Sequence, residues 1–196
     1  MKRFRVRDHF ESDILAGATL GERHLRLLLD HLPPGVAQNA ILIDFDGMVG
    51  ATGSYLKAFL VRLLASRQAT LDPDPGPSVE VGSIFVTNLH EDVATDLRGV
   101  LVEAGLACLE ALECDSERVR KARCHGNLEP AVRDALEALL AARAATAADL
   151  GRKGKKIGVT AWHYRLGVLL KLGLARRSKS DRSWLYEPAA MEVSHG

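Results

Sequence analysis

Aromatic residues, cysteines and long apolar runs are scarce in this chain of 196 residues. Each shortage argues against a class of structure: an aromatic-rich core, a disulfide framework or a membrane span. Aromatic side chains make up only 5% of a sequence that is 47% apolar, which favours Ala- and Leu-rich helices packed on a modest sheet. The three cysteines Cys108, Cys114 and Cys124 are an odd number without framework spacing, so we expect a reduced, cytoplasmic protein. No apolar stretch is long enough to span a bilayer, and MKRFRVRDHFESD at the start lacks the apolar core of a signal peptide. We therefore expect no membrane partner.

The common catalytic and cofactor motifs are also missing. The sequence contains no nucleophile elbow, Walker loop or dinucleotide fingerprint. Cys114, Cys124 and His125 offer metal-ligating atoms, but their spacing matches no usual zinc pair and a fourth ligand is missing. We therefore expect neither a cofactor nor a metal.

The charge is unevenly distributed, although the net charge is only +1. Residues 151–186 contain ten bases and one acid, a local net charge of +9, whereas residues 1–150 contain 16 bases and 22 acids, a net of −6. An acidic body joined to a basic tail is typical of a regulator with a nucleic-acid-binding end.

The stretch ILIDFDGMVGATGS, residues 41–54, is the strongest local signal in the chain. Its apolar β-branched start predicts a buried strand, and Asp44, Asp46 and Gly47 then bring polar groups and a turn. Thr52 and Ser54 offer hydroxyls where a helix should begin. Strand ends that feed helix starts are where α/β proteins place their chemistry. The simplest interpretation of both aspartates is that they cap the turn and the helix.

Strands and helices alternate along the first part of the chain. We predict an edge strand within residues 4–10, a helix that begins with a capping box at Thr19 and Glu22, a helix from Tyr55 to about Arg67, and strands over 79–86 and 106–112. Glu91 and Asp92 mark the start of a helix that Gly105 ends. This order predicts an α/β domain with a mainly parallel sheet over residues 1–115, followed by a linker over 116–126.

The second predicted unit covers residues 127–190 and consists of three helices and a hairpin. Pro130 suits a first helical turn, Thr146 and Asp149 frame a short second helix, and Trp162 begins the inward stripe of the third. Two strands joined by a polar tip follow over residues 174–186. This order is that of a winged helix-turn-helix.

The first unit resembles the STAS-like domain family of unknown function found in bacteria. The resemblance rests on ILIDFDG, on TGSYLKAFL and on IFVTN leading into EDVATDLRGVL, and it covers residues 4–112. In bacterial anti-sigma-factor antagonists, which share the STAS fold, a partner kinase phosphorylates a serine at this strand-to-helix junction, and Ser54 matches that serine by position. The resemblance implies a protein partner, such as a kinase or an anti-sigma-like protein, at a surface containing Asp44, Asp46, Thr52 and Ser54.

The second unit resembles bacterial winged-helix regulators in TAADL and in IGVTAWHYRLGVLLKLGLARR. We therefore expect it to bind double-stranded DNA, with the third helix in the major groove and the hairpin over phosphates. Thr160, His163 and Tyr164 are expected to approach bases, and Lys171 to hold phosphate. The remaining predicted contacts are basic side chains before the helix and on the wing: Lys153, Lys155, Lys156, Arg176, Arg177, Lys179 and Arg182.

Two other functions stay open, and so does a homodimer. The order strand-DxDG, Thr and a later strand ending in Thr-Asn resembles the haloacid-dehalogenase phosphatases. That resemblance would make Asp44 the nucleophile, Asp46 the acid/base and Thr87 a phosphate ligand beside Mg²⁺. Alternatively, the second unit docks on a protein rather than on DNA, and the chain is an adaptor. The prediction from sequence is a cytoplasmic regulator, not an enzyme, that joins a partner-binding α/β domain to a DNA-binding winged helix.

Overall fold

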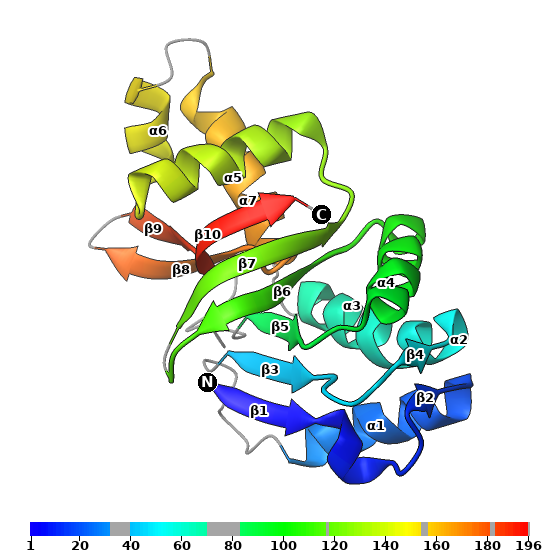
Figure 1. The fold of residues 1–196 in the computed structure, drawn as a ribbon. Coiled ribbons are helices and arrows are strands. Elements are labelled where there is room, and N and C mark those ends of the chain that lie inside the picture. Colours follow the sequence, from blue (N-terminus) through cyan, green and yellow to red (C-terminus); the bar gives the residue numbers. More distant parts are fainter. Residues whose placement is uncertain (32–39, 70–82, 117, 154–156, 181–182, 196) are drawn as a thin grey trace.

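The computed structural model describes residues 1–31, 40–69, 83–116, 118–153, 157–180 and 183–195. They form a mixed α/β protein around a six-stranded sheet of order β1-β3-β5-β6-β7-β10 (Figure 1). All neighbouring pairs are parallel except β6 and β7, which are antiparallel. The sheet strands are β1 (Lys2–Arg5), β3 (Ile41–Asp44), β5 (Ile84–Thr87), β6 (Ala107–Cys114), β7 (Val119–Gly126) and β10 (Ala190–His195).

Helices follow the first strands in the alternation that the sequence predicts. A 3-10 helix over Val6–His9 ends β1, and the two-residue strands β2 (Ile14–Leu15) and β4 (Gly50–Ala51) pair with each other. A continuous helix runs from Gly53 to Ala69 as α2, a π-helical turn and α3. The helical bounds are α1 Ala18–Asp30, α2 Gly53–Leu56, the π-turn Lys57–Val61, α3 Arg62–Ala69 and α4 Glu91–Ala104.

The two faces of the sheet carry two separate hydrophobic cores, because successive strand residues point to opposite faces. Ile41 and Ile43 of β3 pack with α1, α2 and α4, together with Leu28, Tyr55 and Leu97. Leu42 and Phe85 lie in the other core, which holds the inward residues of the C-terminal helices. The sheet is therefore buried on both sides, which explains why β3 and β5 are apolar runs without alternation.

The C-terminal part contains the predicted three helices and hairpin, but it also returns to the sheet. The elements are α5 (Pro130–Ala142), α6 (Ala147–Lys153), α7 (Val159–Lys171), β8 (Ala175–Ser180) and β9 (Ser183–Pro188). Pro130 lies in the first turn of α5. At the start of α6, the N–H and hydroxyl of Thr146 donate to the Asp149 carboxylate, and the Asp149 N–H donates to the Thr146 hydroxyl. After β9 the chain adds β10 alongside β7 (Figure 1). The segment after the second predicted unit thus joins the sheet of the first, and both predicted units contribute to one of its cores.

The segment predicted as a linker, residues 116–126, differs most from expectation because it contains strand β7. Val119, Ala122 and Cys124 are buried, whereas Arg120, Lys121 and Arg123 face outward. The pairing of β6 with β7 shifts register near Ala111 to Cys114. Such an irregularity breaks the two-residue alternation by which a strand is recognised, so the segment looked like a charged, aperiodic linker.

Two smaller expectations are corrected. Thr19 is not the N-cap of the first helix, because α1 already begins at Ala18 and Gly17 caps it with φ of 86°. The strand predicted over 79–86 is described only from Ile84, and residues 79–82 lie outside the described residues. The helix ended by Gly105 is confirmed, since Gly105 adopts φ of 64° directly after α4.

Candidate functional site

The carboxyl ends of β1, β3 and β5 lie side by side and gather polar groups around Asp44. The register places Arg5, Asp44 and Thr87 next to one another across the three strands. The Asp44 carboxylate is only 2% exposed. Arg3 donates to its Oδ2 from Nε at 2.9 Å and Nη2 at 2.8 Å, and Asn88 donates to Oδ1 at 2.7 Å. Both oxygens of Asp44 are therefore engaged by protein donors, which suits a structural carboxylate.

Thr87 lies next to Asp44 in the register, but the side chains of Asp46 and Thr87 form no hydrogen bond with the Asp44 carboxylate. Asp46 is exposed, and its backbone N–H donates to Asp44 Oδ1 at 3.1 Å. Thr87 Oγ1 donates to the carbonyl of Ala111 at 2.9 Å, toward the neighbouring strand rather than toward Asp44. Asp44 thus stabilises the turn after β3, as the simpler interpretation expects. Asp46 does not cap the following helix, because Thr52 is its N-cap.

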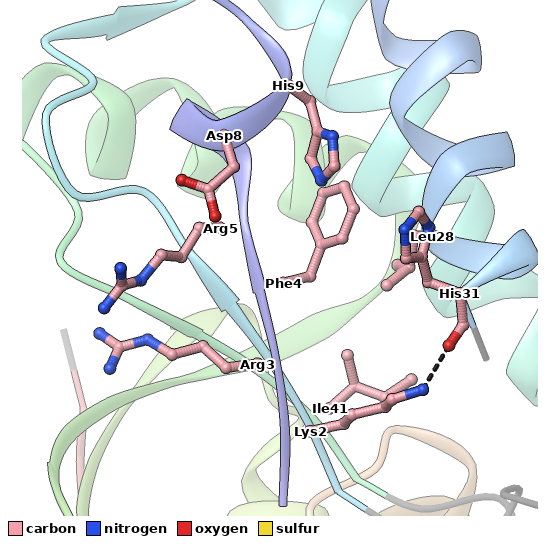
Figure 2. A pocket seen from close by; sticks show the side chains of 9 residues that line it. All are labelled: Lys2, Arg3, Phe4, Arg5, Asp8, His9, Leu28, His31 and Ile41. Carbon is pink, nitrogen blue, oxygen red and sulfur yellow. Dashed lines mark hydrogen bonds between the residues drawn. The ribbon is translucent and has the colours of Figure 1, made fainter. Parts of the chain in front are cut away.

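Figure 2 shows how β1 presents different side chains on its two sides. Arg3 and Arg5 extend away from Phe4, on the side of Asp44, and Arg5 Nε lies 3.6 Å from the Asp44 carboxylate. On the other side Phe4 stacks on His9 at 4.7 Å between ring centroids, and Lys2 Nζ donates to the carbonyl of His31. A hollow of about 280 Å³ lies along this edge strand. Lys2, Arg3 and Arg5, which line it, bond to His31 or Asp44.

Thr52 and Ser54 lie at the start of the helix, as predicted. Thr52 Oγ1 accepts from the N–H of Tyr55 at 3.4 Å and from that of Gly17 at 3.1 Å, and it lies 3.0 Å from Ser54 Oγ. Both side chains are exposed. Thr52 therefore joins the start of α1 to the start of α2, whereas Ser54 presents its hydroxyl to solvent.

A buried histidine–tyrosine pair beneath this junction was missed by the sequence reasoning. His24 and Tyr55 are both fully buried, and the Tyr55 hydroxyl is 2.8 Å from His24 Nδ1. Burial lowers the pKa of His24 to about 4 and raises the pKa of Tyr55, so the histidine is neutral. The only available signal was the place of His24 on the inward stripe of α1, four residues before Leu28.

The exposed side of α7 carries the polar residues predicted for base contact. Thr160, His163 and Lys171 are exposed, and Tyr164 is 72% exposed. The opposite side is buried, with Trp162, Leu166, Leu169 and Leu170 in the core. Gly167, between Tyr164 and Lys171, has open space around its Cα, so nothing in the described protein covers this face.

The hairpin divides the basic residues that the sequence placed together. In the register of β8 and β9, Arg177 is opposite Tyr186 and Lys179 opposite Trp184, and Arg177 stacks over the Trp184 ring at 4.2 Å. Arg176 is opposite Glu187 and projects from the other face, because neighbours alternate along a strand. Lys155, Lys156 and Arg182 lie outside the described residues, as does the side chain of Lys153. The structure thus brings Arg177 and Lys179 together and separates Arg176 from them.

The cysteine and histidine considered for zinc are also separated. Cys114 is exposed, Cys124 lies in the core on the side of α5, and burial raises the pKa of its thiol to about 11. His125 bonds instead to the buried carboxylate of Glu110, with 2.9 Å from Nε2 to Oε2. Within the described ranges, no three His, Cys, Asp or Glu side chains are grouped so that they could hold a metal ion.

Comparison with known proteins does not assign this chain to a family. No family model, no curated protein and no solved structure matches the chain. In the parts of the chain that the structure covers, every helix is too short or too polar to cross a bilayer.

Proposed function

We propose that this protein is a regulator that binds double-stranded DNA through α7 and the β8–β9 hairpin. On this proposal α5 to β9 form a winged helix-turn-helix, with α7 in the major groove and the hairpin over phosphates. The acidic first part is a STAS-like domain that docks a protein partner. The proposal keeps the assignment made from the sequence and revises its contact residues.

The observation that carries the proposal is a group of cations without acidic partners beside an uncovered helix face. Lys171, Arg177 and Lys179 form no ion pair with any described residue. Several cations elsewhere do have an acidic partner, for example Lys57 with Glu103 at 2.7 Å and Arg62 with Glu22 at 2.8 Å. Uncompensated charge next to an exposed polar helix face is what a polyanion requires.

The partner-docking part of the proposal is supported by the surface around Ser54. Ile14 of β2 and Val49, directly before β4, are 52% and 43% exposed, and β4 leads into the helix start that carries Ser54. An exposed serine together with exposed apolar side chains offers both a modifiable group and contact area. A phosphate on Ser54 would add about two negative charges at a helix start and change which partner docks.

The test is a fluorescence-polarisation titration with labelled random-sequence duplexes of about 30 base pairs, because no operator is known. With only three phosphate contacts, affinity should fall about 40-fold between ~50 and ~200 mM salt. Arg177→Glu combined with Lys179→Glu should weaken binding at least about tenfold at ~50 mM salt. The matched control, Arg62→Glu with Lys57→Glu, reverses two ion-paired cations on the π-turn and α3 and should change affinity little.

Absence of binding by the wild type at low salt would reject the DNA proposal, and so would equal losses in both double variants. A pull-down with and without nuclease then distinguishes the adaptor function, because a protein partner survives nuclease treatment. The partner surface is tested separately by mass spectrometry of the native protein for phosphate on Thr52 or Ser54. Activity of the wild type toward a phosphate ester with Mg²⁺ that Asp44→Asn abolishes would instead support the phosphatase.

A further inference from the structure

Three arginines converge on a cavity at the base of the hairpin, on the side away from Arg177 and Lys179. The cavity has a volume of about 390 Å³. Arg118 precedes β7, Arg143 follows α5, and Arg176 comes from β8. The floor and rim are mainly apolar, and the remaining lining residues are Val119, Ala144, Glu187, Pro188, Ala189, Ala190 and Met191. Figure 1 shows the base of the hairpin next to the start of β10, and residues of both line the cavity.

The positive charge in this cavity is not compensated within the described protein. Glu187 is the single acidic residue in a lining that includes three arginines, and it forms no ion pair with any of them. Asp115, in the turn before β7, forms an ion pair with Arg120 at 3.1 Å and accepts the backbone N–H of Arg118 at 2.8 Å. Like charges held together without a counter-charge cost free energy, which a bound anion would relieve.

Arg176 and Arg143 show that the cavity is organised rather than merely basic. The Nε of Arg176 is buried without a hydrogen-bond partner among the described residues. Buried donors are usually paired, so an acceptor brought by a ligand would complete the bonding of this one. Arg143 has a left-handed backbone with φ of 63°, which is uncommon outside glycine. One of its Nη atoms donates to the carbonyl of Met191 at 2.8 Å, and this bond fixes the guanidinium at the rim with its other donors free for a ligand.

We propose that this cavity binds the phosphate group of a small phosphorylated molecule about the size of a mononucleotide. Guanidinium forks match phosphate oxygens with paired hydrogen bonds, and three of them suit a dianion better than a single carboxylate. The volume lies in the range of small-molecule sites, and Pro188, Ala190 and Met191 offer apolar contact to the remainder of the ligand. This site is separate from the proposed DNA contacts, which lie on the other face of the hairpin.

The location indicates what binding would do. The lining comes from the start of β7, the end of α5, the hairpin and the start of β10, which are separate elements between residues 118 and 191. A phosphate bridging these arginines would hold the hairpin against the sheet. Ligand binding should therefore raise the melting temperature of the full chain as well as give a heat of binding.

The test is isothermal titration of the full chain with inorganic pyrophosphate, at ionic strength held constant with sodium chloride. We expect saturable binding with a Kd below about 1 mM and a melting temperature that rises by a few degrees at about 10 mM pyrophosphate. Arg143→Gln and Arg176→Gln should each weaken binding at least about tenfold. The control Arg62→Gln removes an exposed arginine far from the cavity and should leave Kd unchanged.

Two comparisons make the result decisive. Adenosine 5′-monophosphate should displace pyrophosphate, whereas adenosine should not, because it lacks the phosphate. Lack of saturable pyrophosphate binding, an equal loss in Arg62→Gln, or equal competition by adenosine would overturn the proposal. Circular dichroism of each variant checks that it folds. Arg143→Gln should bind DNA as tightly as the wild type does. That result would show that the cavity and the proposed DNA-binding surface are separate sites, so that either proposal can be rejected without the other.

Discussion

At the scale of single residues, several buried polar side chains of this protein bond to polar groups from other segments. Asp44 collects donors from three segments, Glu110 holds His125, and Tyr55 holds His24. Each pair joins positions far apart in sequence, so each fixes a tertiary contact at the expense of desolvating polar groups. Removing one partner leaves the other buried without a hydrogen bond. The resulting loss of stability exceeds the net contribution of the intact pair.

His24 should make the stability depend on pH in a defined window. Its pKa is about 4 in the folded protein, against the ordinary value of 6.5 when the chain unfolds. Between these values the unfolded chain binds a proton that the folded protein does not, so stability falls as the pH drops from about 6.5 toward 4. The slope contributed by this group is at most about 1.4 kcal/mol per pH unit.

Urea unfolding at about pH 7 and about pH 5 measures this effect. His24→Gln, which keeps a hydrogen-bonding group near Tyr55, should lose less stability between the two pH values than the wild type does. His163→Gln changes an exposed histidine and should retain the full dependence. An equal pH dependence in His24→Gln and the wild type would contradict the assignment of a neutral, buried His24.

At the scale of elements, the first helix pair is set by a close backbone approach. Gly21 lies on the inward face of α1, and a Cβ built there would be 2.6 Å from the Tyr55 carbonyl oxygen and 2.9 Å from the Ala58 Cβ. Glycine is therefore required by packing, although it weakens a helix by about 1 kcal/mol relative to alanine. The same contact brings His24, one turn further along α1, within reach of Tyr55.

Gly21→Ala and Gly99→Ala should have opposite effects on stability. In α1 the added methyl group forces the helices apart and should cost about 1–3 kcal/mol of unfolding free energy. Gly99 lies on the exposed face of α4 with open space around it, so alanine there should add up to about 1 kcal/mol. Denaturant midpoints at unchanged m-value give both numbers. Stabilisation by Gly21→Ala would disprove the close packing of α1 on α2.

At the scale of the whole molecule, one sheet joins what the sequence divides into two units. Leu42 and Phe85 of the first unit lie in the same core as Leu136, Trp162 and Leu166. Strand β10 comes from the end of the chain and pairs with β7 from Ala190 to His195. Separating the units would expose one face of the sheet and the inward faces of α5 and α7 together.

The full chain should therefore unfold in a single cooperative transition. Both tryptophans of the sequence, Trp162 and Trp184, lie in the C-terminal part, so their fluorescence reports on that part alone. Far-UV circular dichroism reports on all helices, including α1 and α4. The two signals should give the same urea midpoint. A fluorescence transition that clearly precedes or follows the dichroism transition would show that the two units fold independently.

Local order along the chain could be read from the sequence, because its signals are themselves local. The buried strand at Ile41, the helix that Gly105 ends and the inward stripe of α7 follow from apolar periodicity and from capping residues. The exposure of Thr160, His163 and Tyr164 follows from the same stripe. The capping role of Thr52 and the exposure of Ser54 follow from their place after a strand and turn.

Tertiary structure alone decided which segments meet. No local pattern could show that β10 pairs with β7, some seventy residues earlier in the chain, or that a register shift hides β7 in a charged segment. The side chains that donate to Asp44 come from β1 and from the end of β5. Strands that are neighbours in the sheet lie far apart in the sequence, so the sequence does not show that these side chains meet. Arg176 and Arg177 are adjacent in sequence yet point to opposite faces, because strand pairing places one in a cavity and the other over Trp184.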